Sequence, residues 1–181
     1  MSNPPLIWTA KDVGSQAALR AACWQRVVDF TGNPQLVQFA TNLIHNCNID
    51  ARDINKLARC VLEYAQKNIK YFREQPERFA SPIRTILWGI GDCDDKSIFI
   101  ATVLRSFRIP VRLVFITFKV IKDGVERVVG HVWPQAFLDN KWVSLESVRP
   151  LAFGASPLAR LAKKGIKPLT VNFVGDTANA A

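Results

Sequence analysis

The hydrophobic pattern of this sequence changes its period once, and that change constrains the fold more than any other feature. Before Pro110 the apolar residues recur at helical spacing, whereas residues 111–148 are rich in β-branched and aromatic residues. Helices followed by neighbouring strands predict the α+β class, in which a helical N-terminal half packs on an antiparallel β-meander.

Residues that cap or open helices stand in front of several of the helical segments. Asn and Asp side chains cap first-turn amides, and proline is well tolerated at the first helical position. Residues 71–79 are polar and charged and are expected to form a loop. The pattern predicts helices over residues 15–30, from Asn33-Pro34 through Ile44, from Asp50 or Asp53 through Ala65, from Ser81-Pro82 through Leu87, and from Cys93 to the stop at Arg108-Ile109-Pro110.

Three strands are predicted after Pro110, over Val111–Ile121, Val128–Leu138 and Lys141–Val148. Turn residues separate them at 122–124 and at 139–140. A short helix is expected over residues 157–164, followed by a C-terminal tail at residues 176–181.

The last hairpin has a register that can be worked out on paper. A two-residue turn at Asp139-Asn140 makes Glu146 a diagonal neighbour of His131, about 7–8 Å away between backbones. A slip of one residue would turn Glu146 to the opposite face of the sheet. The register pairs Leu138 with Lys141, Phe137 with Trp142, Gln135 with Ser144 and Trp133 with Glu146.

Length and composition favour a single globular domain. The 181 residues are 49% hydrophobic, which excludes a disordered chain, and one domain is expected over residues 1–175. The apolar runs are too short to span a bilayer, and the start Met1-Ser2-Asn3-Pro4-Pro5 lacks the features of a signal peptide. A cytoplasmic location, or a place in a phage virion, is therefore expected.

The four cysteines are expected to stay unpaired. Cys23, Cys47 and Cys60 stand among apolar residues in helical patterns, which predicts buried free thiols, although four cysteines could also form two disulfides. The sequence has no Cys-x-x-Cys pair and only two histidines, His45 and His131. These features argue against a metal site, and no cofactor is expected.

The net charge of +9 is concentrated in the second half of the chain. From Arg105 onward, twelve Lys or Arg residues stand against five Asp or Glu residues. A basic half can bind nucleic acid or an acidic partner. No dense basic run is interleaved with aromatic residues, so ordinary solvated surface is the favoured interpretation and nucleic-acid binding is not expected.

The chemistry of the chain is concentrated in three short motifs. Gly91-Asp92-Cys93-Asp94-Asp95 puts a cysteine in the first turn of a predicted helix, where the unpaired amides favour the thiolate form. The acidic neighbours of Cys93 oppose that effect, and a buried structural cysteine is the alternative interpretation. Downstream, His131 can serve as a base and Glu146 as the acid that orients it.

These motifs resemble the transglutaminase-like family. Its pattern is a Gly-x-Cys that opens a helix, a strand that begins with His-x-Trp, and a hairpin return that ends in an acid. The resemblance covers residues 54–149, through Gly91-Asp92-Cys93, His131-Val132-Trp133 and the strand that ends at Glu146. Glu146 departs from the family, which usually has Asp at that place, so the geometry of the triad is the open point.

The resemblance implies a papain-like thiol enzyme that forms a thioester acyl-enzyme. A peptide or a cell-wall amide is the expected substrate, and hydrolysis is favoured over protein-glutamine cross-linking. A non-catalytic structural or adaptor protein on the same fold, for example in a bacteriophage particle among neighbouring subunits, is the alternative. The backbone amide of Cys93 would help form the oxyanion hole.

A second oxyanion donor is needed, and the sequence does not choose one. Gln66, Tyr71 and Trp88 are the candidates. Trp133 is a candidate substrate contact, although a tryptophan inside a strand more often packs in the core.

Overall fold

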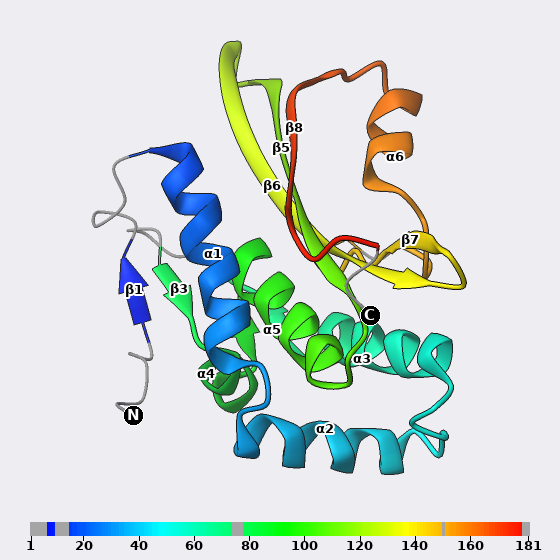
Figure 1. The fold of residues 1–181 in the computed structure, drawn as a ribbon. Helices are drawn as coiled ribbons and strands as arrows, with labels where there is room; N and C mark the ends of the chain where they lie inside the picture. Colours follow the sequence, from blue (N-terminus) through cyan, green and yellow to red (C-terminus); the bar gives the residue numbers. More distant parts are fainter. Residues whose placement is uncertain (1–6, 10–14, 74–77, 150, 179–181) are drawn as a thin grey trace.

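A four-stranded antiparallel sheet forms the middle of the molecule (Figure 1). The computed structural model describes residues 7–9, 15–73, 78–149 and 151–178, and the statements below concern these ranges. The strands lie in the order β7-β6-β5-β8, where β5 is Val111–Lys122, β6 is Val125–Leu138, β7 is Lys141–Ser144 and β8 is Pro168–Gly175.

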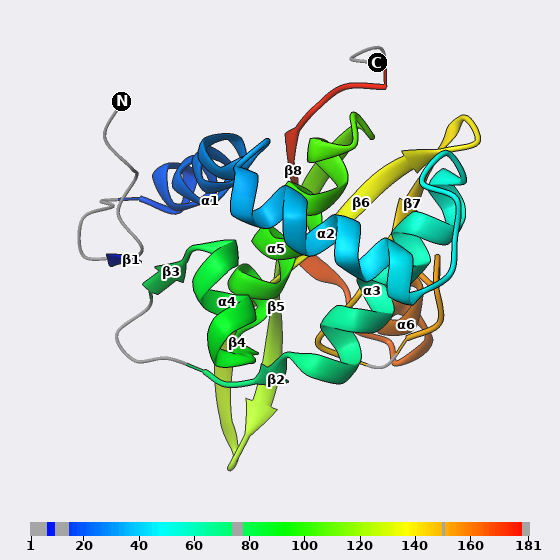
Figure 2. The same ribbon diagram turned by 90° about the horizontal axis from the view of Figure 1, so that it is seen from below.

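Helices cover both faces of this sheet (Figures 1 and 2). The larger layer holds α1 (Gln16–Phe30), α2 (Pro34–Asn46), α3 (Ile54–Asn68), α4 (Pro82–Trp88) and α5 (Cys93–Ser106), whereas α6 (Pro157–Lys163) lies on the other face. The side chains of Ser15, Asn33, Asp53 and Ser81 cap the first four helices. Together with the α5 start at Cys93, these caps confirm the predicted helix starts.

Two short strand pairs lie outside the main sheet. β1 (Ile7–Thr9) pairs with β3 (Arg78–Ala80), and β2 (Lys70–Tyr71) pairs with β4 (Ile90–Gly91). The predicted loop at 71–79 therefore contains strand residues at both ends, and residues 74–77 lie outside the described ranges.

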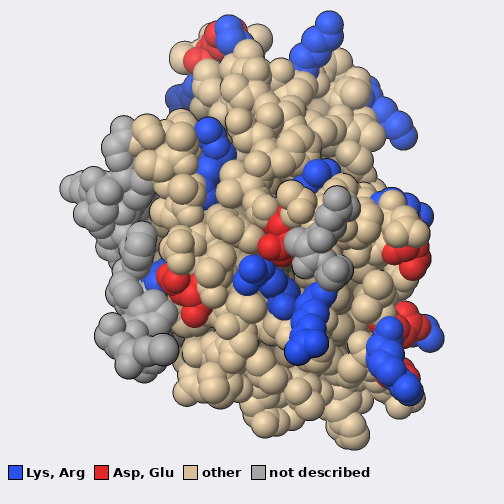
Figure 3. All heavy atoms as spheres, viewed as in Figure 1, with Lys and Arg blue, Asp and Glu red and all other residues tan. Residues whose placement is uncertain are grey.

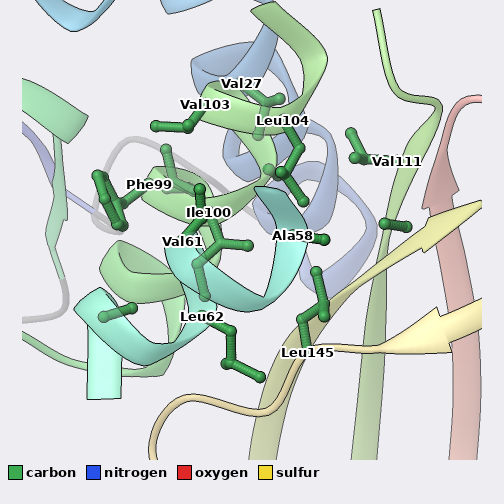
Figure 4. Close-up of a cluster of buried hydrophobic side chains, with 14 of the residues drawn as sticks. Val27, Ala58, Val61, Leu62, Phe99, Ile100, Val103, Leu104, Val111 and Leu145 are labelled. Atoms are coloured by element: carbon green, nitrogen blue, oxygen red, sulfur yellow. The ribbon is translucent and has the colours of Figure 1, made fainter. Parts of the chain in front are cut away.

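The main core fills the space between the larger helical layer and the sheet. Figure 4 shows side chains from α1, α3 and α5 meeting residues such as Val111 and Leu145. Because strand side chains alternate, the next residues of β5 point to the opposite face. There Val114 and Ile116 form a second cluster with Trp133 and with Leu161 of α6.

The hairpin of β5 and β6 is longer than predicted. It closes on Asp123 and Gly124, which both have positive φ angles, and β6 begins at Val125 instead of Val128. Figure 2 shows the tip of this hairpin projecting beyond the helices. Ile121, Val125 and Val128 are exposed there, so this part of the hairpin is held by its own pairing and not by burial.

The following strand is shorter than predicted. The pairs Phe137–Trp142 and Gln135–Ser144 confirm the expected register, but β7 ends at Ser144 and not at Val148. The Glu146 carboxylate accepts hydrogen bonds from the amides of Val148 and Arg149, and this local turn stops the strand. Trp133 consequently has no strand partner at Glu146.

Three further features differ from the sequence predictions. β8 was not expected, yet it forms an edge of the sheet by pairing with β5. Cys47 and Cys60 form a disulfide between the end of α2 and α3, so the prediction of free thiols was wrong for this pair. The predicted tail starts with an anchored residue, because the Asp176 carboxylate accepts hydrogen bonds from Arg105 and from the Val111 amide. Residues 179–181 lie outside the described ranges.

Candidate active site

Cys93 is the first residue of α5, where the helix start is fixed by acidic side chains. Asp92 is the N-cap, and its Oδ1 accepts the amides of Asp94 at 2.9 Å and Asp95 at 3.3 Å. Asp95 completes a capping box with the Asp92 amide and also accepts the Ala80 amide at 2.7 Å. The Asp92 and Asp95 carboxylates therefore build the turn that presents Cys93.

His131 and Glu146 form a close pair on the other side of the site. His131 Nε2 lies 2.6 Å from Glu146 Oε2, and the two side chains are 15% and 1% exposed. An ionised carboxylate only accepts hydrogen bonds, so the pair places the proton of a neutral imidazole on Nε2. Nδ1 is then the nitrogen left to act as a base.

The Glu146 carboxylate is held by more than His131. Its Oε1 accepts the amides of Val148 at 2.8 Å and Arg149 at 3.1 Å. Burial raises the pKa of Glu146, but the hydrogen bonds from His131 and from the two amides outweigh burial and leave the pKa below its usual value. The residue is therefore suited to stay ionised behind the imidazole.

Gln66 supports the chain around Glu146 from the helical layer, and the buried Lys96 lies close enough to feel the Glu146 charge. The Gln66 side-chain amide donates to the backbone oxygens of Glu146 at 2.8 Å and Leu151 at 3.0 Å. Lys96 is 2% exposed and its Nζ donates to the Ile69 oxygen at 2.8 Å. Burial lowers the pKa of Lys96 to about 8, although the nearby Glu146 charge partly opposes that shift.

A hydrogen bond ties the cysteine helix to the histidine strand. Ser97 lies one turn after Cys93 on α5, and its Oγ donates to the oxygen of Val132 at 3.2 Å. Val132 directly follows His131 in β6. Cys93 and His131 line the same cavity, which has a volume of about 580 Å³.

Comparison with known proteins identifies the family. The family model of the transglutaminase-like superfamily matches residues 38–147, which is more than half of the chain. The chain belongs to the transglutaminase-like superfamily. Comparison with curated proteins finds no match.

Comparison with solved structures finds a similar fold at a TM-score above 0.5, together with weaker matches. A candidate protease from Parabacteroides distasonis is 13% identical, with a TM-score of 0.54 over 90% of this chain and 31% of its own. A candidate cysteine protease from Cytophaga hutchinsonii is 14% identical, with a TM-score of 0.48 over 94% of this chain and 63% of its own. LapG from Legionella pneumophila, EGTA-treated, is 17% identical, with a TM-score of 0.40 over 90% and 77%. This chain thus spans less than two thirds of the first two proteins.

The predicted oxyanion and substrate residues fall in different places around the transglutaminase-like site. Tyr71 lines the cavity and is half exposed. Burial raises the pKa of Tyr71, and the thiolate form of Cys93 and the Asp92 carboxylate raise it further. Trp88 is exposed and stacks under Arg84, outside the cavity, and the Gln66 amide is also outside it. The structure therefore brings only Tyr71 of these donors to Cys93.

Trp133 has a supporting position and does not line the cavity. Its ring is 1% exposed, stacks on the His131 ring with centroids 5.9 Å apart, and donates through Nε1 to Ser144 Oγ at 3.3 Å. Trp133 was predicted as a candidate substrate contact, but in the structure its buried ring packs on the His131 imidazole and helps to fix it. The His-x-Trp spacing was a usable signal, because residues two apart in a strand share a face.

The remaining cysteines differ sharply from Cys93. The free cysteines of the described ranges are Cys23, which is buried, and Cys93, which is partly exposed. Burial raises the pKa of the Cys23 thiol well above its ordinary value, and the Asp94 and Asp95 charges raise it further. Cys23 is therefore an unreactive thiol of the core, whereas the Cys93 thiol is partly accessible.

Three further features of the described residues concern metal binding, the basic surface and the membrane. The ligand atoms of Asp92, Cys93 and Asp94 lie within 4.8 Å of one another, but they are neighbours at a helix start and Asp92 is used as its cap. Figure 3 shows Lys and Arg scattered over one face of the molecule, with no single continuous patch. None of the helices in the described ranges has the length and apolar character that a bilayer crossing requires.

Proposed function

We propose that this chain is a cysteine enzyme that hydrolyses an amide bond of a peptide. Cys93 is the nucleophile, His131 the base, and Glu146 the residue that orients His131. The observation that carries the proposal is the 2.6 Å contact between His131 Nε2 and Glu146 Oε2, behind a cavity that Cys93 and His131 both line. Membership of the transglutaminase-like superfamily supports the same assignment.

In the first half of the reaction, His131 Nδ1 takes the proton of the Cys93 thiol. The sulfur then attacks the carbonyl carbon, and a C–S bond forms while the oxygen becomes an anion. When this intermediate collapses, the C–N bond breaks and the His131 proton passes to the leaving amine. The product is a thioester on Cys93 and a free amine.

In the second half, water replaces the amine. His131 takes a proton from water, the oxygen attacks the thioester carbonyl, and the C–S bond breaks as a C–O bond forms. The proton returns to the Cys93 sulfur and a carboxylic acid leaves. An amine in place of water would give cross-linking by the same steps.

The oxyanion requires hydrogen-bond donors at the N-terminus of α5. The backbone N–H of Cys93 lies at the positive end of the helix dipole, which favours a negative charge there. Tyr71 is the proposed second donor, because it lines the cavity, is half exposed and carries a hydroxyl that can donate a hydrogen bond.

Alkylation of the native protein tests the nucleophile. At pH 6.5 with iodoacetamide, Cys93 is expected to be alkylated far faster than Cys23, because burial raises the pKa of Cys23 and hides it. Mass mapping after digestion gives both rates in one sample. The variant His131→Asn should slow Cys93 and leave the Cys23 rate as it was.

Hydrolysis gives the second readout. Denatured casein is expected to be cleaved by the parent protein and not by Cys93→Ala, and added glycine ethyl ester would reveal amine transfer as mass-shifted products. Slow labelling of Cys93 and Cys23 at equal rates would contradict the proposal. In that case the non-catalytic scaffold on the same fold would become the better description.

A further inference from the structure

The outer edge of β6 presents backbone groups in a regular order. The hairpin closes on a two-residue turn, so the flanking pair Lys122–Val125 exchanges both backbone hydrogen bonds with each other. Hydrogen-bonded and non-hydrogen-bonded pairs then alternate along the strand, and the pairing runs without a break to Val111–Ala136. Every second residue of β6 therefore turns its N–H and C=O groups away from β5.

Hydrogen bonds near the site agree with this alternation. The oxygen of Pro134 accepts the Leu145 amide at 2.9 Å, and the oxygen of Val132 accepts the Ser97 hydroxyl at 3.2 Å. Both oxygens thus point away from β5. The next outward residues along β6 are Gly130 and Val128.

Gly130 and Val128 have no such partner among the residues the structure describes. β7 pairs with β6 only from Gln135 to Leu138, and the backbone hydrogen bond from Leu145 to Pro134 is the last one that the chain after β7 makes to this edge among the described residues. Both residues are exposed. An unpaired strand edge is a template for another strand.

The glycine at position 130 is not needed by the fold itself. Its φ angle is not among the positive ones, and a Cβ added there would meet only the Ile116 oxygen, at 3.9 Å. A glycine inside a strand weakens that strand, and it often marks a place where another backbone approaches closely. The face of the sheet at Gly130 is therefore open, and no side chain of this residue stands in the way of a bound chain.

This edge leads directly into the site. Gly130 and Val128 line the same cavity as Cys93 and His131, and Gly130 is the residue before His131. Val132 is the last outward residue of β6 whose backbone oxygen already has a partner within the protein. That partner is the hydroxyl of Ser97, which lies one turn after Cys93 on α5. A strand added beyond that point would bring its backbone beside the Cys93 sulfur.

We propose that the substrate is an extended polypeptide segment that adds to the outer edge of β6 and exchanges backbone hydrogen bonds with Val128 and Gly130. This inference rests on the proposed function and names its substrate class. The two edge residues are about 7 Å apart along the strand, so only a run of consecutive peptide groups can meet both. A small or branched amide lacks that run.

The test uses electrophiles of two lengths. Acetyl-Ala-chloromethyl ketone and acetyl-Ala-Ala-Ala-Ala-chloromethyl ketone alkylate the same sulfur, but only the longer one can pair with the edge. Each Cys93 alkylation rate is divided by the iodoacetamide rate of the same protein, which removes changes in thiol reactivity. Two backbone hydrogen bonds predict a gain of about tenfold for the longer reagent.

The variants Val128→Pro and Gly130→Val should abolish this gain. The first removes an outward N–H, and the β6 strand already holds Pro134 at a position of the same orientation, so the inward pairing with β5 is kept. The second fills the space beside the edge. Arg127→Ala is the matched control, because the Arg127 backbone faces β5, and it should keep the gain. Circular dichroism and thermal unfolding check that each variant is folded.

The outcomes separate this inference from the function on which it rests. A gain that survives Val128→Pro and Gly130→Val, or no gain in the parent protein although Cys93 reacts selectively with iodoacetamide, overturns strand addition alone. Loss of the gain on methylation of the reagent's amide nitrogens supports it. A Cys93 that reacts with none of the reagents overturns both proposals.

Discussion

The inner and outer halves of the β5–β6 hairpin share one register but lie in different surroundings. Around Val114 and Trp133 the hairpin is buried on both faces, between the larger helical layer and α6. Around Ile121 and Val125 it is exposed. His131 stands at the boundary, so its ring rests on a fixed core while the strand before it stays open. The buried part of β6 thereby holds His131 rigidly, and the exposed part leaves the site accessible.

The two halves also carry contrasting pairs of titratable side chains. His131 and Glu146 are nearly buried, at 15% and 1% exposure, whereas Lys119 and Glu126 pair at 2.8 Å with 53% and 60% exposure. An exposed pair contributes little because water and salt screen it. The buried Glu146 carboxylate instead has three hydrogen-bond partners, which fix its orientation and favour its ionised form.

The largest effect is expected in the inner half. Trp133→Ala would remove a ring that is 1% exposed and supports His131, and should lower the free energy of unfolding by about 3–5 kcal/mol. Urea denaturation followed by circular dichroism measures the change. A loss below about 1 kcal/mol would show that the inner half is not held by this cluster.

The buried pair of His131 and Glu146 gives the next effect. Glu146→Gln should lower turnover by about one to four decades, because the amide orients His131 less well than a carboxylate. Glu146→Asp should be milder, since it keeps the charge. Lys119→Gln, which removes the exposed pair, serves as the control and should leave turnover unchanged. Equal effects of Glu146→Gln and Lys119→Gln would break the comparison.

The buried ammonium beneath the site predicts a pH effect. The pKa of Lys96 is about 8 in the folded protein, against about 10.4 when unfolded, so the unfolded state binds more protons between these values. The contribution of Lys96 to stability therefore rises by about 3 kcal/mol in total as the pH increases through both pKa values. Lys96→Met should remove that rise. Denaturation curves at several pH values compare the two proteins, and parallel curves would exclude it.

The smallest effect is expected at the hairpin tip. Ile121 is 80% exposed, so Ile121→Ala should change the free energy of unfolding by no more than about 0.5 kcal/mol. The same denaturation assay applies. A loss as large as that of Trp133→Ala would mean that the tip is covered in solution.

Local chemistry made much of this molecule predictable. Caps such as Asn33 and Ser81 fix helix starts through short-range hydrogen bonds, and the Asp139-Asn140 turn fixes the hairpin register. The same register brought His131 and Glu146 together on paper. However, the Glu146 carboxylate reaches His131 Nε2 from a turn and not from a strand. The turn is held by the amides of Val148 and Arg149, and the alternation of side chains along a strand could not predict it.

What the sequence left undetermined depended on distant contacts. β8 was overlooked although Thr170, Val171, Asn172 and Phe173 alternate, because its edge position leaves Phe173 and Val171 exposed and the pattern weak. The Cys47–Cys60 bond requires α2 and α3 to lie side by side, which helical patterns alone do not specify. The role of Gln66 likewise came from a chain segment eighty residues away.

The disulfide between Cys47 and Cys60 determines how many free thiols a titration of this protein should detect. Ellman's reagent should titrate a single thiol in the native state, a second after denaturation as Cys23 is uncovered, and four only after reduction. Cys47 is exposed, so a thiol reductant in the buffer can open the bond. Two new nucleophiles would then compete with Cys93 for any electrophile, and its stoichiometry of modification would no longer report on one site.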